Sequence, residues 1–218
     1  QFLLRTTSSA ALRIIGPIVN AIDTHPDKVH NILIELIRAE DRQPNTRQFW
    51  ALWEKFAEGI RKAKWLSRVD DGPSGGTELI GAIFLNTWWK EDIHHWRSLE
   101  GYGHRIDEFL EAMPARSTVL EAYIRFLYHI GEQSLPRAFI SIARQLEKGN
   151  LSQLTLKQNS IFMLEILLQR YVYGKPLELK RESDLREAVF SLLDFLIESG
   201  SSAAFRMRDD FVAPISIA

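Results

Sequence analysis

Apolar residues recur along this 218-residue chain at intervals of three and four, the spacing that places them on one face of an α-helix. The clearest case predicts a helix over about residues 26–39. Its buried face would consist of Val29, Ile32, Leu33, Leu36 and Ile37. Thr24 and Asp27 resemble a capping box. Pro26 fits the first helical turn, where a backbone N–H is not needed.

The same spacing predicts further helices along the chain. Their approximate ranges are 46–66, 77–90, 118–130, 135–148, 156–173 and 183–199. Asn45 with Gln48, and Thr118 with Glu121, resemble further helix starts. Apolar residues cover several sides of the 77–90 segment and nearly all sides of the 156–173 segment. We expect the latter to be the most enclosed helix.

Two segments fit the helical pattern less well. Pro17 lies within an apolar run, so the first helix either bends or begins at this proline. Residues 201–214 mix charged residues with isolated apolar ones and depart from helical periodicity. We expect them to form a tail that packs back on the helices or a connection to a further segment.

The fold class follows from these patterns. No stretch alternates strictly between apolar and polar residues, so essentially no β-sheet is predicted. We predict an all-α fold in which antiparallel helix pairs stack as an α-solenoid or an irregular multi-helix array. Helix starts near residues 9 and 46, and near 118 and 156, are spaced close to the roughly 40–47 residues of a HEAT or armadillo repeat. The chain therefore resembles HEAT/armadillo repeats in architecture, which implies a long exposed interaction surface.

A loop rich in glycine interrupts the helical pattern at residues 70–76 and is the expected hinge or repeat junction. It contains the G-x-S-x-G string of the serine nucleophile elbow. That elbow needs a preceding strand, whereas a helix is predicted here, so we interpret the loop as a linker. We predict a single domain over residues 1–218. We also expect the chain, which begins without methionine, to be a piece of a longer protein.

The composition narrows the functional classes. The 27 basic and 28 acidic residues give a net charge of −1, which argues against nucleic acid or an anionic membrane as the main partner. The absence of cysteine excludes disulfides and thiolate metal sites and favours a reducing compartment. No apolar stretch approaches the roughly 20 residues that cross a bilayer. We therefore expect a cytoplasmic protein with no membrane association and no cofactor.

The strongest candidate binding region is rich in tryptophan and histidine. It comprises Trp88, Trp89, His94, His95, Trp96, Tyr102 and His104. Large aromatic side chains contribute much of the binding energy at protein interfaces. We predict that this region binds another protein or another domain of the same parent chain. The alternative is that the rings belong to the core.

A metal-dependent helical enzyme is one alternative function. Glu91 and His94 have the E-x-x-H spacing that places two metal ligands on one helix face, with His95 and His104 close in sequence. Di-iron carboxylate bundles need two such motifs, and this chain contains one. We therefore assign no metal ligand and no catalytic residue.

A nucleic-acid interface at a basic helix end is another alternative. Arg61, Lys64, Trp65 and Arg68 would lie on one side of this end, where cations can meet phosphates and a ring can stack on a base. Cations are also favoured at helix C-termini by the helix dipole. The leading prediction is a non-enzymatic helical scaffold that binds a protein.

Overall fold

A computed structural model describes residues 2–5, 7–42, 46–67, 76, 78–85, 104–130, 135–149, 155–174, 179 and 181–212. These residues form helices and connecting turns, and none of them belongs to a β-strand. The all-α prediction is confirmed. No helix among these residues is long and apolar enough to cross a membrane.

The chain divides into two compact units, Gln1–Pro114 and Ala115–Ala218. The predicted hinge lies outside the described residues except for Gly76, which is buried and helical. Both the hinge and the single domain therefore stay predictions. Each unit is described by itself below.

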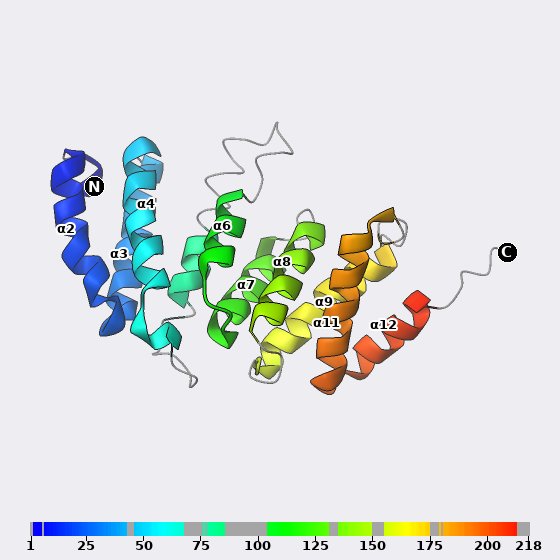
Figure 1. Ribbon diagram of the computed structural model, residues 1–218. Helices are drawn as coiled ribbons and strands as arrows, with labels where there is room; N and C mark the ends of the chain where they lie inside the picture. The colour runs from blue at the N-terminus through cyan, green and yellow to red at the C-terminus, as the bar shows by residue number, and fades with distance from the viewer. Residues whose placement is uncertain are drawn as a thin grey trace. The chain divides into compact units, whose positions relative to one another are not determined.

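The N-terminal unit consists of helices and short 3₁₀ turns (Figure 1). They are α1 (Phe2–Arg5), α2 (Ser8–Asn20), η1 (Ala21–Asp23), α3 (Pro26–Arg42), α4 (Thr46–Arg61), η2 (Lys64–Ser67), a helical stretch at 78–85, and α6 (His104–Ala112). Helix α4 packs against α2 and α3, and α1 contacts α2 and α3. Helix α2 continues through Pro17, so it does not begin there.

The apolar residues at helical spacing in the 46–66 segment are part of the core of this unit. All of them are buried: Phe49, Leu52, Trp53, Phe56, Ile60 and Ala63. Phe109 of α6 packs its ring against Trp53 and against Phe84 of the 78–85 stretch, with ring centroids 6.1 and 5.4 Å apart. These contacts between distant parts of the sequence hold the unit together.

The predicted 46–66 helix is split in the structure. Helix α4 ends at Arg61, and η2 begins at Lys64. The backbone N–H of Lys64 donates to the Asp23 carboxylate, with N and Oδ1 2.6 Å apart. This bond gives the Lys64 N–H a side-chain acceptor on η1 in place of a carbonyl of α4, which explains the break.

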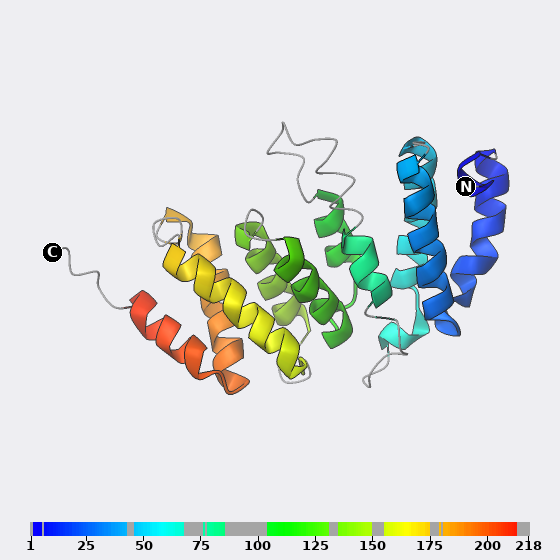
Figure 2. The same cartoon turned by 180° about the vertical axis from the view of Figure 1, so that it is seen from behind.

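The described residues of the C-terminal unit include five long helices (Figure 1). They are α7 (Ser117–Ile130), α8 (Leu135–Lys148), α9 (Gln158–Gly174), α11 (Ser183–Glu198) and α12 (Ser202–Val212). Helix α9 packs against α7 and α12, and α8 packs against α11. Figure 2 accordingly shows α7, α9 and α12 side by side in one layer, with α8 and α11 behind them. Each helix thus contacts the next helix of its own layer, which is compatible with a helical-repeat architecture.

Two predicted capping boxes are wrong. Helix α3 begins at Pro26, as expected, but the Thr24 hydroxyl donates to the Ala21 carbonyl at 3.3 Å instead of capping the helix. Thr118 is the second residue of α7. Its presumed partner Glu121 is buried and accepts the backbone N–H of Lys157 at 2.7 Å. A tertiary contact therefore replaces the local one that the spacing suggested.

Residues 202–212 form a helix, which corrects the expected irregular tail. The Ser201 hydroxyl accepts the Ala204 N–H at 3.0 Å and caps α12. Ala204 and Met207 are its buried apolar residues among those described. Two buried positions give too few apolar residues for the sequence to show helical periodicity here. The alternative in which this segment packs back on the other helices is confirmed, because α12 contacts α9 and α11.

Candidate functional site

The predicted tryptophan- and histidine-rich binding region lies almost entirely outside the described residues. This applies to Trp88, Trp89, His94, His95, Trp96 and Tyr102, and also to the alternative metal ligand Glu91. His104 begins α6, but its side chain is not described. Among the residues whose positions are described, no three His, Asp or Glu side chains gather where they could hold a metal ion. The partner-binding and metal hypotheses for this region stay predictions.

The predicted basic patch is described in part. Arg61 is half-buried at the last turn of α4, and Lys64 is exposed in η2. The Trp65 side chain and Arg68 lie outside the described residues. The described residues therefore do not test whether the four residues lie together, and the nucleic-acid alternative stays a prediction.

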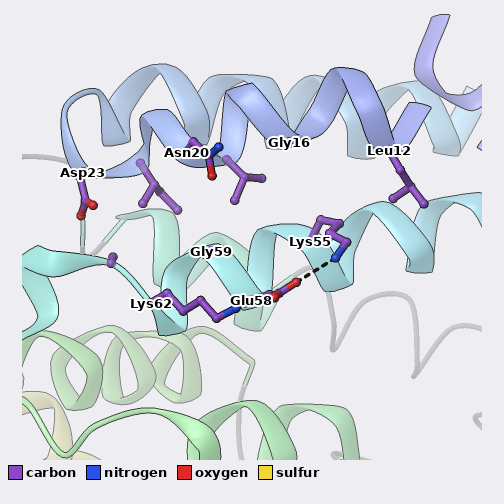
Figure 3. Close-up of a pocket in the computed structure, with 11 residues that line it drawn as sticks. Leu12, Gly16, Asn20, Asp23, Lys55, Glu58, Gly59 and Lys62 are labelled. Carbon is purple, nitrogen blue, oxygen red and sulfur yellow. Dashed lines mark hydrogen bonds and ion pairs between the residues drawn. The ribbon is translucent and has the colours of Figure 1, made fainter. Parts of the chain in front are cut away.

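A cleft of about 450 Å³ lies between α2 and α4 (Figure 3). Its apolar wall includes Leu12, Val19 and Ile22, and its polar rim includes Asn20 and Asp23. Two glycines, Gly16 and Gly59, contribute only backbone to the lining. Sequence reasoning did not predict this cleft, because it depends on how closely two helices approach.

The rim of the α2–α4 cleft carries a triad of charges on one face of α4. The ammonium groups of Lys55 and Lys62 reach the two carboxylate oxygens of Glu58 at 2.9 and 2.6 Å (Figure 3). The hydrogen bonds from Lys62 and Lys55, together with their positive charge, lower the pKa of the Glu58 carboxyl to about 2. Each lysine therefore already has an anionic partner, and the rim offers little net charge to a ligand.

An exposed apolar stripe runs along α9 in the C-terminal unit. Phe162 and Tyr173 expose 55% and 51% of their surface. They are eleven residues apart, about three helical turns, and therefore lie on the same face of α9. Ile166 is half-buried between them on this face. We call Phe162, Ile166 and Tyr173 the α9 stripe.

The α9 stripe corrects the prediction that the 156–173 helix is the most enclosed. Helix α7 is more enclosed, because six consecutive residues from Val119 to Ile124 are buried. The sequence did contain a signal for the exposed face of α9. Gln158, Glu165 and Gln169 form a polar line on this helix, and Phe162 and Tyr173 lie beside it. Because aromatic residues are usually buried, the sequence did not predict that Phe162 and Tyr173 lie on the solvent-facing side.

The end of the stripe is tied to α12. The Tyr173 hydroxyl donates to the Asp210 carboxylate, with the oxygens 2.7 Å apart. This hydrogen bond, more than burial or the negative charge of Asp210, raises the pKa of the Tyr173 phenol above its ordinary value. The bond fixes the tyrosine ring at the edge of the stripe.

A second cleft, of about 390 Å³, lies in the C-terminal unit between the start of α9 and the end of α11. Its lining includes Ile161, Phe195 and Glu198. Glu198, the charged residue among the described lining residues, is exposed. The α9 stripe is therefore the candidate site with the clearest chemistry among the described residues. No protein-family model matches this chain, and no curated protein matches its sequence.

Proposed function

We propose that this chain is a helical scaffold that binds another protein, and that the α9 stripe is part of the binding surface. The observation that carries the proposal is the exposure of Phe162 and Tyr173 on one face of a single helix. Burying a Phe side chain stabilises a complex by roughly 1.5–3 kcal/mol. Leaving two aromatic rings in water on one face gives up this gain, which a partner surface would recover.

The composition of the stripe fits a protein partner. Exposed aromatic rings flanked by polar residues are typical of the energetic centre and rim of protein interfaces. Here the polar line of Gln158, Glu165 and Gln169 borders the rings. The Tyr173 ring at the end of the stripe can pack against a partner while its hydroxyl donates to Asp210.

The helical layers support the scaffold role. We propose that they form an array of HEAT/armadillo type, in which each helix buries one face on its neighbours and leaves another for binding. The contacts of α9 with α7 and α12, and of α8 with α11, fit this arrangement. We further propose a cytoplasmic location, on the basis of the absence of cysteine.

Substitution of Phe162 tests the proposal. We would purify Phe162→Glu and Phe205→Glu chains and compare the proteins that each retains from a cell extract with those retained by wild type. Phe205 is the matched control, because it is also 55% exposed but lies on α12. We expect Phe162→Glu to lose a partner that wild type and Phe205→Glu both keep, with unchanged melting temperatures.

Two outcomes would contradict the proposal. One is that Phe162→Glu and wild type retain the same proteins with equal affinity when the interaction is measured with purified components. The other is that both variants lose the same partner, since a general effect of an added carboxylate would then explain the loss.

A further inference from the structure

The α9 stripe lies beside the place where α12 ends. Tyr173 is the last residue but one of α9, and its hydroxyl donates to Asp210, two residues before the end of α12 at Val212. Helix α12 also packs against α9, and Figure 2 shows the two helices side by side. The chain therefore leaves α12 next to the Tyr173 end of the stripe.

Residues 213–218 follow α12 and lie outside the described residues. We call them the tail. Six residues of extended chain span up to about 20 Å. The α9 stripe from Tyr173 to Phe162 covers eleven residues of helix, which is about 16 Å. The tail is therefore long enough to run back along the stripe.

The composition of the tail suits an apolar surface. None of its side chains is charged, so covering them costs no desolvation of a charge. Pro214 cannot continue an α-helix and favours an extended conformation in the residue before it. Alternate side chains of an extended segment lie on the same side, which would put Ile215 and Ile217 together and Ser216 on the opposite side. An extended tail would thus offer one apolar side to the stripe.

We propose that the tail folds back along α9, so that Ile215 and Ile217 cover the α9 stripe and compete with the protein partner for it. The autoinhibitory role rests on the proposed function, whereas the contact itself does not. The tail is tethered beside the stripe at an effective concentration on the order of millimolar, so a modest apolar contact is enough. Gln169, exposed at the border of the stripe, carries an amide donor and acceptor for the backbone of the tail.

Disulfide formation tests the contact without any partner, because the chain contains no cysteine. We would prepare the full chain with Ile166→Cys and Ile217→Cys, and a matched control with Phe205→Cys and Ile217→Cys. Ile166 lies seven residues along α9 from Tyr173. Phe205 lies seven residues along α12 from Val212, so both are roughly 10 Å along a helix from the end at which the tail begins. A tail that does not bind the stripe would reach both positions equally well.

The measurement is the rate of intramolecular disulfide formation in dilute, mildly oxidised protein, read from the mass of the intact chain after free thiols have been alkylated. We expect the Ile166→Cys/Ile217→Cys chain to close about tenfold faster than the control. Equal rates, or disulfide-linked dimers in place of the intramolecular bond, would overturn the proposal. Neither result would bear on the proposed partner binding, which the Phe162 substitution tests separately.

Charged substitutions in the tail are a second test that leaves every described residue unchanged. The test variant is Ile215→Glu/Ile217→Glu. The control, Ser216→Glu/Ala218→Glu, adds the same charge on the opposite side of an extended tail. The probe is 8-anilinonaphthalene-1-sulfonate, a dye that fluoresces on exposed apolar surface. We expect about a twofold rise in fluorescence with the test variant alone, and Phe162→Glu in that variant should remove the rise. Equal fluorescence of test variant, control and wild type would overturn the proposal.

The same tail variants test the competition with the partner. The Ile215→Glu/Ile217→Glu chain should bind the partner about three- to tenfold more tightly than wild type, because the tail no longer occupies the stripe in part of the chains. The Ser216→Glu/Ala218→Glu chain should bind like wild type. Equal affinity of all three chains would overturn the competition even if the disulfide forms. Absence of any partner would contradict the proposed function alone, since the disulfide and dye measurements still decide whether the tail covers the stripe.

Discussion

Gly59 of α4 and Val19 of α2 lie so close together that a β-carbon on residue 59 would collide with the Val19 side chain. The glycine thus permits the close approach of the two helices that line the α2–α4 cleft. Valine has a branched, stiff side chain, so it cannot move aside at low cost. The approach of α2 and α4 depends on this one missing side chain.

Replacement of Gly59 by alanine should therefore destabilise the N-terminal unit. We expect the free energy of unfolding to fall by about 1–3 kcal/mol, because the added methyl group overpacks the contact with Val19. Gly81→Ala is the matched control, since Gly81 is also helical and a β-carbon there meets nothing within 4 Å. It should raise stability by about 0.5–1 kcal/mol through helix propensity. Urea denaturation of both variants decides the question, and equal effects would contradict the packing argument.

Lys55 and Lys62 should lower the pKa of the Glu58 carboxyl well below its ordinary value. A carboxyl titration by NMR should give Glu58 a pKa of about 2. Because the folded-state pKa is below that of the unfolded chain, the contribution of Glu58 to stability is present above pH ~4.5 and is lost as the pH falls towards 2. The Lys55→Ala/Lys62→Ala variant should return the pKa towards its ordinary value. An ordinary pKa in the unmodified chain would show that the triad does not form in solution.

Tyr173 should show the opposite dependence at alkaline pH. Its folded-state pKa is raised by the hydrogen bond to Asp210, so the neutral phenol is favoured in the folded state. The stability that this bond contributes is present below the unfolded pKa of about 10 and is lost as the pH rises through the folded pKa. Thermal unfolding across this range should show the loss in wild type and a smaller loss in Tyr173→Phe. Identical profiles for the two chains would mean that the bond contributes nothing.

The buried carboxylate of Glu121 should stabilise the start of α9. Its side chain accepts the backbone N–H of Lys157 at 2.7 Å and is 4% exposed. Glu121→Ala removes this acceptor, and we expect a loss of about 1–3 kcal/mol in the free energy of unfolding. Glu121→Gln keeps an oxygen acceptor of nearly the same shape and should cost less. Chemical denaturation of both variants tests this order, and equal losses would show that the negative charge, which both variants remove, matters more than the hydrogen bond.

Sequence periodicity predicted the helices that bury one face. It did not predict contacts between individual residues that are distant in the sequence. The apolar residues at helical spacing in α11 are buried as this spacing predicts: Leu185, Val189, Leu192, Leu193 and Leu196. The capping role assigned to Glu121 was wrong, because its side chain reaches a residue 36 positions away. The close approach of Gly59 and Val19 is equally invisible in the sequence, since nothing local to either residue identifies its neighbour.

The candidate site was harder to predict than the fold. The prediction that the 156–173 helix is the most enclosed covers Phe162 and Tyr173, because helices that are apolar on nearly all sides are usually buried. Their exposure depends on which faces of α9 meet α7 and α12. The polar line through Gln169 marked the solvent-facing side, but it did not show that aromatic side chains share this side.

Site-specific photocrosslinking tests the central claim most directly. A photoreactive phenylalanine analogue would replace Phe162 in one chain and Phe205, as the equally exposed control, in another. If the α9 stripe binds a protein, the analogue at position 162 will form a covalent adduct with one defined partner, and excess unlabelled wild-type chain will suppress it. Adducts of the same identity and yield from both positions, or none from position 162, would contradict the account.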